Sequence, residues 1–259
     1  MNLQAAADTL GVHYQTAYRW VREGQLVAGK IGGSYDVEAS EVERFLALRL
    51  IPAAPPLSMR VRDWAAQLRR FEAALREGNE LDAREVVDRL SDGNVPLIDL
   101  CEKLFTPCMH NIGEAWHTGT VSVAEEHRAT AIAERILGKL ASQPRGRPRG
   151  TIVVSTPPGD LHGLPAIMAA LVLREDRWKV HHLGANMPFE ELATFSVAVN
   201  ADLVVLSSTL TPSNELTVRV GETLKGFGIR VLSGGPGATL RTLIALARSS
   251  EKVLETQRF

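Results

Sequence analysis

One histidine of the sequence stands at a spacing that suits metal chemistry. His162 follows Asp160 by two residues in a loop rich in glycine and proline, and this spacing suits an imidazole that ligates a metal while the carboxylate orients it. An apolar run, 151–155, precedes the loop, and an alanine- and leucine-rich helix is predicted over 166–173. A strand that turns into a helix in this way begins a βαβ unit, and doubly wound folds bind ligands at such loops. The alternative is a surface loop that happens to hold a histidine.

A second histidine stands beside a carboxylate further upstream. Trp116 closes one predicted helix, and Glu126 and His127 follow after nine intervening residues, one turn into the next helix. A helical core does not need a carboxylate and an imidazole at this point, because burying them unpaired is costly. The alternative is that Trp116 caps the helices while Glu126 and His127 form solvated surface.

Glu126 and His127 lie in a region, residues 59–143, that is predicted to be helical throughout. Apolar side chains recur there at spacings of three and four, which indicates amphipathic helices. Breaks rich in glycine and asparagine separate four segments, over 59–77, 80–90, 96–115 and 123–140. Four helices with short connections predict an antiparallel bundle, which by itself says nothing about function.

Asp160 and His162 lie in residues 151–259, where strands and helices are predicted to alternate. Strands are expected over 151–155, 179–183, 202–207 and 229–233. This alternation predicts a Rossmann-like α/β domain with a parallel, doubly wound sheet and candidate ligand loops at the carboxyl ends of its strands.

Two further loops of this predicted sheet carry small or polar residues. Ser208 and Leu210 follow the third strand, and Gly234 and Gly235 follow the fourth. The glycine pair does not match the Gly-x-Gly-x-x-Gly fingerprint of dinucleotide-binding proteins, and it follows a late strand. Both facts disfavour a nicotinamide enzyme.

Residues 1–50 have the pattern of a winged helix-turn-helix module. Two short helices, over 3–10 and 14–23, flank a glycine-containing turn. The side chains expected to face base edges and phosphates in the major groove are Tyr14, Gln15, Tyr18, Arg19 and Arg22. A glycine-rich hairpin over 27–37 forms a small wing, in which Lys30 and Tyr35 are available to the DNA backbone. The alternative is a helical module that binds another protein.

The charge of this first module is not that of a strong DNA binder. Residues 1–50 hold five Lys and Arg residues against six Asp and Glu residues. Because neutralisation of phosphates supplies much of the affinity for DNA, a monomer of this kind binds weakly. A homodimer or homotetramer on several half-sites would compensate, so we expect an oligomer with operator DNA as its partner. Linkers rich in proline follow at 51–58 and, with arginine and glycine, at 144–150.

The composition bounds the remaining possibilities. A chain of 259 residues, 45% hydrophobic and 23% charged, is expected to form two or three ordinary globular domains. Its net charge of −1 provides no general attraction to nucleic acid or anionic membranes. Cys101 and Cys108 fall on one helical face and are expected to be reduced core thiols. No signal peptide or membrane-length apolar run is apparent, so we expect a cytoplasmic protein without a membrane partner.

Two known domain types resemble parts of this chain. The first module resembles the MerR/excisionase winged-helix group, with its wing at 32–35 and a following helix expected over 37–48. The loops at the strand ends resemble the cobalamin-binding Rossmann domain, whose pattern is Asp-x-His-x-x-Gly, then Ser-x-Leu, then Gly-Gly. One position departs from that pattern, because Pro165 stands where the family has glycine, with Gly163 nearby.

The order of the parts resembles the CarH/LitR-type cobalamin-dependent photoreceptor regulators, and the resemblance covers essentially the whole chain. In that family a Trp and, after nine intervening residues, a Glu-His pair lie in a helical cap domain, as Trp116, Glu126 and His127 do here. The resemblance implies a light-responsive transcriptional repressor rather than an enzyme. Its cofactor would be adenosylcobalamin, with methylcobalamin as the alternative. The dark, cofactor-bound form would be an oligomer on DNA that illumination disassembles.

The resemblance also implies which residues hold the cofactor from the sheet side. His162 would displace the cofactor's own dimethylbenzimidazole and ligate cobalt from below, with Asp160 orienting the imidazole. The residues that would line the path of the displaced nucleotide tail are Ser208, Leu210, Gly234 and Gly235.

On the bundle side, the resemblance implies that Trp116 and Val123 cover the adenosyl group and that Glu126 hydrogen-bonds the nucleoside. His127 would ligate cobalt from above once light has cleaved the cobalt–carbon bond. Two other functions stay open. One is a corrinoid carrier for methyl transfer, and the other is a regulator that senses cobalamin or another tetrapyrrole without light.

Overall fold

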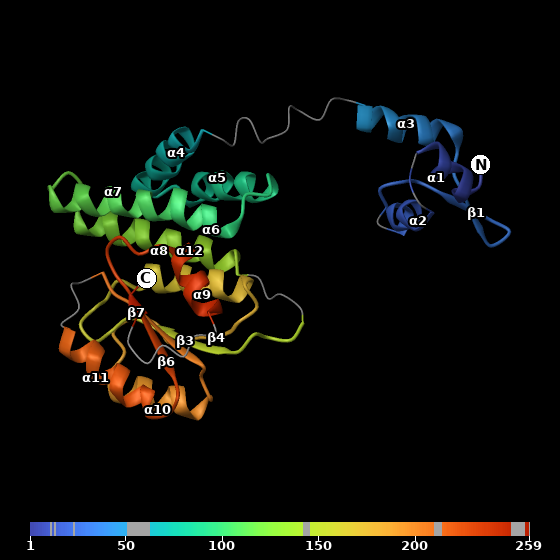
Figure 1. Ribbon diagram of the computed structural model, residues 1–259. Helices are drawn as coiled ribbons and strands as arrows, with labels where there is room; N and C mark the ends of the chain where they lie inside the picture. The colour runs from blue at the N-terminus through green and yellow to red at the C-terminus, as the bar shows by residue number, and fades with distance from the viewer. Residues whose placement is uncertain are drawn as a thin grey trace. The chain divides into compact units, whose positions relative to one another are not determined.

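A computed structural model of the protein describes residues 1–10, 12, 14–22, 24–50, 63–141, 146–209, 214–249 and 257–258. The chain forms two compact units, Met1–Arg62 and Asp63–Phe259 (Figure 1). The linker predicted over 51–58 lies outside the described residues. No helix within the described ranges is long and apolar enough to cross a membrane.

The first unit contains three helices and a two-stranded hairpin. In chain order these are α1 (Leu3–Thr9), α2 (Tyr14–Arg22), β1 (Gly29–Ile31), β2 (Ser34–Asp36) and α3 (Ala39–Leu50). The hairpin turns through Gly32 and Gly33, whose φ angles of 58° and 88° lie in the left-handed region that glycine adopts without strain. Ala7 and Ala17 are fully buried in the core of this unit, where small side chains let α1 and α2 pack closely.

The second unit begins with a bundle of helices. These are α4 (Trp64–Glu77), α5 (Glu80–Asp92), α6 (Leu97–Leu100), η1 (Cys101–Phe105), α7 (Thr106–His117) and α8 (Val123–Lys139). Phe71 and Phe105 meet edge to face in the core, with ring centroids 5.0 Å apart. The Arg135 guanidinium of α8 lies 2.7 Å from the Glu80 carboxylate of α5, which ties the two helices together at the surface.

The third bundle segment contains a turn that apolar spacing did not predict. One α-helix was expected over 96–115, but Cys101–Phe105 form a π-helical turn in which the amide of Thr106 donates to the carbonyl of Cys101. Pro107 follows directly. A proline inside a helix has no N–H to donate, and its ring collides with the carbonyl four residues earlier. A wider turn just before Pro107 relieves this conflict without ending the helix.

The rest of the second unit is a parallel sheet with helices on both faces. Its strands are β3 (Thr151–Ser155), β4 (Lys179–His182), β5 (Leu203–Ser207), β6 (Arg230–Gly234) and β7 (Gln257–Arg258), in the order β4-β3-β5-β6-β7. The helices α9 (Gly163–Glu175) and α12 (Leu240–Arg248) cover one face. The opposite face is covered by α10 (Phe189–Ala198) and α11 (Asn214–Lys225). The sheet is therefore doubly wound, as predicted.

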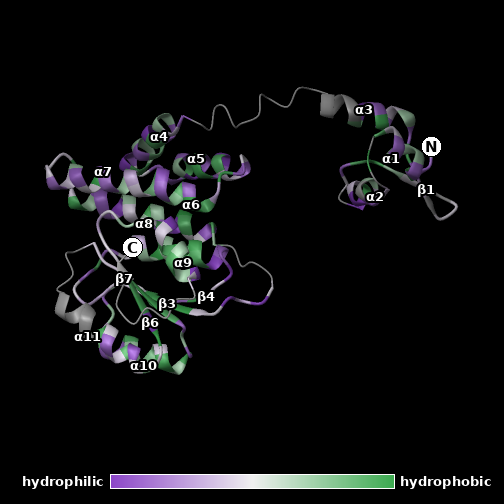
Figure 2. Ribbon diagram, viewed as in Figure 1, coloured by the Kyte–Doolittle hydropathy of each residue, from purple (hydrophilic) through white to green (hydrophobic). Residues whose placement is uncertain are grey.

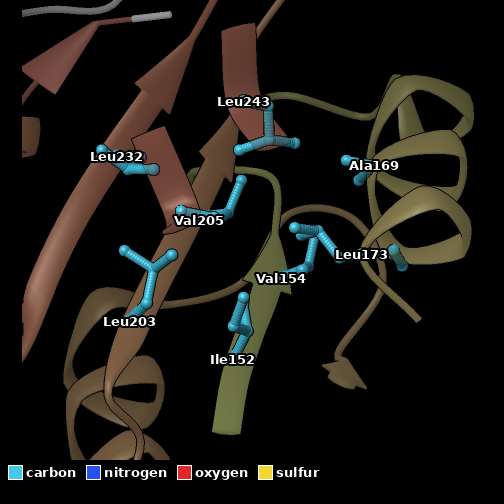
Figure 3. Close-up of a cluster of buried hydrophobic side chains, with 11 residues drawn as sticks. Ile152, Val154, Ala169, Leu173, Leu203, Val205, Leu232 and Leu243 are labelled. Atoms are coloured by element: carbon cyan, nitrogen blue, oxygen red, sulfur yellow. The ribbon is translucent and has the colours of Figure 1, made fainter. Parts of the chain in front are cut away.

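The central strands β3 and β5 are apolar over most of their length, as 152–154 and 203–206, because helices cover both faces (Figure 2). Figure 3 shows Ile152 and Val154 of β3 packed against Ala169 and Leu173 of α9. On this same side of the sheet, α8 of the bundle packs against α9. The bundle and the sheet thus share the layer formed by α9 and α12.

Candidate functional site

The histidine loop emerges at the topological switch point of the sheet. The first strand, β3, lies between β4 and β5, so the connection after β3 leads to one side and the connection after β5 to the other. In doubly wound folds of this strand order, ligands bind outside the carboxyl ends of the two strands that flank this point. His162 follows β3, and Ser208 follows β5.

The imidazole of His162 is oriented by a buried carboxylate. Nδ1 of His162 lies 2.9 Å from Oδ1 of Asp160, and the His162 amide donates to the same oxygen at 3.0 Å. An ionised carboxylate only accepts hydrogen bonds, so Nδ1 is the donor to Asp160, and in the neutral imidazole Nε2 is the nitrogen with the lone pair. The side chain of Asp160 is 1% exposed whereas that of His162 is 62% exposed. The buried Asp160 thus holds the ring of His162 in place, and the exposed part of the ring carries Nε2, a nitrogen that can bind a metal.

Asp160 is held from a second strand end by a residue that the sequence did not single out. The Thr209 amide donates to Oδ2 of Asp160 at 2.7 Å, and its hydroxyl lies 3.2 Å from Oδ1. The hydroxyl of Ser208 donates to Oδ2 at 3.2 Å. A buried carboxylate requires such donors, because leaving it unsatisfied costs more than an unmade neutral hydrogen bond. The position after Ser208 at a strand end was the only signal for Thr209.

The loop itself is braced by two more residues that sequence reasoning missed. The hydroxyl of Thr156 donates to the carbonyl of Asp160 at 2.6 Å and accepts from the amide of Asn186 at 2.8 Å. The side-chain oxygen of Asn186 accepts in turn from the amide of Gly159 at 2.8 Å. The β3–α9 and β4–α10 loops are therefore fastened together beneath His162.

Pro165, the residue that departs from the cobalamin-binding pattern, is accommodated by the start of α9. The helix begins at Gly163 directly after His162, so Pro165 is its third residue. The first N–H groups of a helix have no partner within the helix, and proline is tolerated there because its missing N–H is not needed.

Two of the remaining sheet-side candidates, Gly234 and Gly235, lie next to Ser208. The amide of Ser208 donates to the carbonyl of Gly234 at 2.9 Å. At Gly235 an added Cβ would stand 3.5 Å from the carbonyl oxygen of Ser208, so the two loops are in van der Waals contact. Leu210 lies outside the described residues. The structure thus brings Asp160, His162 and Ser208 to one end of the sheet with the glycine pair.

The bundle-side candidates lie around the connection between α7 and α8. Trp116 is near the end of α7 and Val123 begins α8, and both are exposed. Nδ1 of His127 lies 2.8 Å from Oε2 of Glu126, whose other oxygen accepts from the hydroxyl of Thr130 at 2.8 Å. Among the residues that the structure describes, no hydrogen bond or ion pair joins this pair to the His162 loop.

The two cysteines do not belong to a metal site. Both are free and buried, and burial raises the pKa of the Cys101 thiol and of the Cys108 thiol to about 12. They are therefore protonated, as the expectation of reduced core thiols requires. Over the described ranges, no three side chains of His, Cys, Asp or Glu gather to hold a bare metal ion.

The DNA-facing candidates divide into exposed and half-buried residues. Gln15, Arg19 and Arg22 on α2 are exposed, as is Lys30 on the wing. The tyrosines pack partly against the core of the first unit, because Tyr18 stacks on Tyr14 and meets Tyr35 edge to face. The ammonium group of Lys30 lies 5.2 Å from the centroid of the Tyr35 ring. The aromatic rings therefore join α2 to the wing, and all three are half-buried.

Three family models match the chain in sequence. Residues 1–48 match a helix-turn-helix domain, and residues 67–141 and 150–248 match two families that are each described as a B12 binding domain. The predicted fold class, a helix-turn-helix domain followed by a helical bundle and a Rossmann-like domain, is confirmed. The chain therefore contains cobalamin-binding domains behind a helix-turn-helix domain.

Two curated relatives and one solved structure place these domains among known proteins. The chain is 29% identical over 147 residues to the HTH-type transcriptional repressor CarH of Myxococcus xanthus, covering 56% of this chain and 49% of that protein. The chain thus spans about half of that repressor's length. It is 28% identical over 159 residues to trimethylamine corrinoid protein 1 of Methanosarcina mazei, covering 59% of this chain and 72% of that protein. The fold of the monomethylamine corrinoid protein of Methanosarcina barkeri is similar, with a TM-score of 0.54 at 13% identity over 71% of this chain and 91% of that one.

Proposed function

The combination of a helix-turn-helix domain with two B12 binding domains is consistent with a CarH-type regulator, and we propose that this protein is a cobalamin-binding, light-responsive repressor of transcription. In this proposal it binds operator DNA in the dark as a cofactor-bound homodimer or homotetramer, and illumination releases it. It is a regulator rather than an enzyme. One joint observation carries the proposal: an outward-facing imidazole on a buried carboxylate and an exposed Trp with a Glu–His pair occur in one chain with a DNA-binding module.

The residues of the sheet end fit the lower side of a cobalamin. His162 would hold the cobalt of the cofactor through Nε2, and the buried Asp160 fixes the ring so that little orientational freedom would be lost on binding. The neighbouring Leu161 is exposed, although it is large and apolar. A macrocycle over His162 would cover this side chain, which would otherwise be left in water. Ser208, Gly234 and Gly235 would accommodate the nucleotide tail, and Leu210 belongs to the same proposal.

The residues at the α7–α8 connection fit the upper side. Trp116 and Val123 are apolar and exposed, and they would pack over the upper ligand. Glu126 would accept hydrogen bonds from hydroxyl groups of a nucleoside, which favours adenosylcobalamin over methylcobalamin. His127 pairs with the Glu126 carboxylate, and it would be the second ligand.

Bound adenosylcobalamin supplies a cobalt–carbon bond that visible light cleaves, and the response to light must come from the protein. In the described state Nδ1 of His127 is bonded to Glu126, so Nε2 is the nitrogen that would turn toward the upper face. Because His127 belongs to α8, its ligation would draw α8 along with it and shift this helix against the α9 layer on which it packs. A change in bundle packing would then alter the oligomer and its hold on DNA.

Residues of α2 and the wing would contact the operator. The exposed Gln15, Arg19 and Arg22 would face the major groove, with Tyr14 and Tyr18 beside them, and Lys30 and Tyr35 would reach the DNA backbone. Nε of Arg44 lies 2.7 Å from Oε2 of Glu41, so this cation is already paired and is less available to phosphate. A single copy would bind weakly, which supports the proposal of an oligomer.

The decisive experiment follows one sample through light and dark. Purified protein is loaded with adenosylcobalamin, and its absorption spectrum, size-exclusion profile and operator affinity are measured before and after green light. We expect a changed spectrum, a smaller species and weaker DNA binding after illumination. An unchanged spectrum together with unaltered DNA affinity would refute the photoreceptor proposal.

A corrinoid carrier for methyl transfer is the second candidate, favoured by the match to trimethylamine corrinoid protein 1. Residues 1–48 match a helix-turn-helix domain, and methyl transfer does not require a domain of this kind. Transfer of the methyl group from methylcobalamin to a thiol, in the presence of a partner methyltransferase, would support the carrier. A third candidate, a sensor of cobalamin or another tetrapyrrole without light, predicts DNA binding that depends on ligand concentration but not on illumination.

A further inference from the structure

The bundle and the sheet are joined by contacts of two different kinds. One is mainly apolar, where α8 packs on α9 and the Thr106 hydroxyl lies 4.0 Å from the sulfur of Met168. The other is ionic and, over the part of the chain that the structure describes, is made by Arg241, near the start of α12. Apolar contacts slide at low cost, whereas an ion pair with fixed hydrogen-bond geometry marks one relative position.

Arg241 uses both its side chain and its backbone in this contact. Nε donates to Oε2 of Glu102 at 3.1 Å, and the guanidinium also bonds to the Asp99 carboxylate. The amide of Arg241 donates to Oε1 of Glu102 at 3.1 Å. That amide belongs to the first turn of α12, where N–H groups lack partners within the helix. A carboxylate of the bundle therefore completes the cap of a helix in the cobalamin-binding domain.

The bundle side of this contact lies at the π-helical turn. Glu102 belongs to η1, and Asp99 precedes it in α6. A π turn replaces the regular hydrogen-bond ladder of the helix and can change its pitch more easily than a continuous α-helix. Lys103 also pairs with Asp99, at 3.0 Å, so two cations face two carboxylates at this point. The contact thus lies where the third bundle segment is least regular.

The sheet side of the contact is linked to the glycine loop by a short, hydrogen-bonded turn. The amide of Ala238 donates to the carbonyl of Gly235 at 2.9 Å, and Thr239 caps α12 by accepting from the amide of Thr242 at 3.1 Å. Arg241 therefore follows the loop that carries Gly234 and Gly235 through a turn with little freedom. A ligand that displaces this loop displaces the start of α12 with it.

We propose that Arg241, with Asp99 and Glu102, is a latch that couples the glycine loop of the cobalamin-binding domain to the position of the helical bundle. The proposal rests on cobalamin binding as proposed above. With the latch formed, the base of the bundle is held against α12 while the α7–α8 end stays free to move. The latch makes the α6–η1 region the pivot of bundle movement and slows release of a ligand held between the two layers.

The test compares two arginines of the same helix. Arg241→Ala and Glu102→Ala each break the latch, whereas Arg248→Ala breaks a similar ion pair, to Asp176, that lies within the α/β domain. Hydrogen exchange of full-length protein without cofactor is followed in peptides that span 99–106 and 238–246. Dissociation of adenosylcobalamin is followed by absorbance in the dark.

Both latch variants are expected to raise exchange in these two segments and to speed dissociation roughly fivefold, the scale of an exposed ion pair. Salt near 1 M should shrink the difference from the wild type, because it screens the pair. Arg248→Ala should leave dissociation unchanged. Equal behaviour of the wild type and both latch variants, or equal effects of Arg241→Ala and Arg248→Ala, would overturn the latch. A wild-type protein that fails to bind cobalamin would refute the proposed function instead, and hydrogen exchange would still decide the latch.

Discussion

The two histidine–carboxylate pairs of the second unit have nearly the same distance between nitrogen and oxygen, but their carboxylates differ in burial. Nδ1 of His162 lies 2.9 Å from Asp160, and Nδ1 of His127 lies 2.8 Å from Glu126. The Asp160 carboxylate is 1% exposed, whereas that of Glu126 is 26% exposed. The bond between imidazole and carboxylate is therefore not what distinguishes the two sites. The difference lies in what holds each carboxylate.

Asp160 is fixed by segments from different parts of the chain, whereas Glu126 depends on its own helix. Ser208 and Thr209 reach Asp160 from the end of another strand. Glu126 is held by Thr130, one turn further along α8. A group whose partners lie on several elements is oriented before its ligand arrives, whereas one held within a single helix moves with that helix. We therefore propose His162 as the permanent ligand and His127 as the conditional one.

The largest effect is expected from removal of the permanent ligand. His162→Ala should weaken dark binding of adenosylcobalamin more than the roughly 100-fold that marks the upper range for loss of an outer-shell partner. The measurement is a spectroscopic titration in the dark. His110→Ala, which removes an exposed histidine from α7, is the matched control and should bind like the wild type. Equal affinities for both variants would show that His162 is not a ligand.

Loss of the buried carboxylate should have the next largest effect. Asp160→Asn removes the charge and replaces one acceptor oxygen by an NH2 group, so the donors of His162 on one side, or those of Ser208 and Thr209 on the other, lose their acceptor. The His162 ring then loses its fixed orientation, and cobalamin affinity should fall by about 10- to 100-fold. The same titration measures the loss.

The control for this change is Asp176→Asn, because Asp176 is also a nearly buried carboxylate of the α/β domain with ionic partners. It should lower the thermal midpoint without a comparable loss of affinity. If the two variants lose affinity in proportion to their loss of stability, Asp160 acts through folding rather than through His162.

The strands could be predicted from the sequence because burial on both faces leaves a continuous apolar run. The limits expected for β3 and β5 agree with the structure to within one residue. β7 was missed, since Gln257 and Arg258 are polar and are defined only by their pairing with β6. The π turn was missed as well, because five residues are too few to separate its period from that of an α-helix.

In the site, too, local features could be predicted from the sequence, whereas contacts between distant residues could not. The spacing of Asp160 and His162 is local, so the sequence reveals it. The amide of Thr209 lies 49 residues further along the chain, and every residue type except proline has that amide. No pattern of side chains can identify such a donor. The brace from Asn186 is equally non-local, because it reaches Thr156 and Gly159 only after the two loops have met.

A smaller effect is expected at the carboxylate of the conditional pair. Glu126→Gln keeps the shape and one acceptor oxygen but removes the charge. Hydrogen bonds of this kind contribute about 0.5–1.5 kcal/mol net, so dark affinity should fall by roughly two- to tenfold. Glu134→Gln, an exposed carboxylate of the same helix, is the control. A preference for adenosylcobalamin over methylcobalamin that survives Glu126→Gln would argue against a contact with the nucleoside.

The smallest dark effect is expected at His127, and this variant tests the comparison most sharply. His127 is 75% exposed and is bonded to its neighbour Glu126 rather than to a fixed scaffold, so His127→Ala should change dark affinity by less than about twofold. After green light the variant should lack the stable spectrum that the wild type reaches, because its upper face has no imidazole to bind. Size-exclusion profiles recorded in parallel show whether release from the oligomer needs this ligation or only the loss of the adenosyl group. A marked loss of dark affinity in His127→Ala would mean that both histidines act before illumination, and the division into a permanent and a conditional ligand would then be wrong.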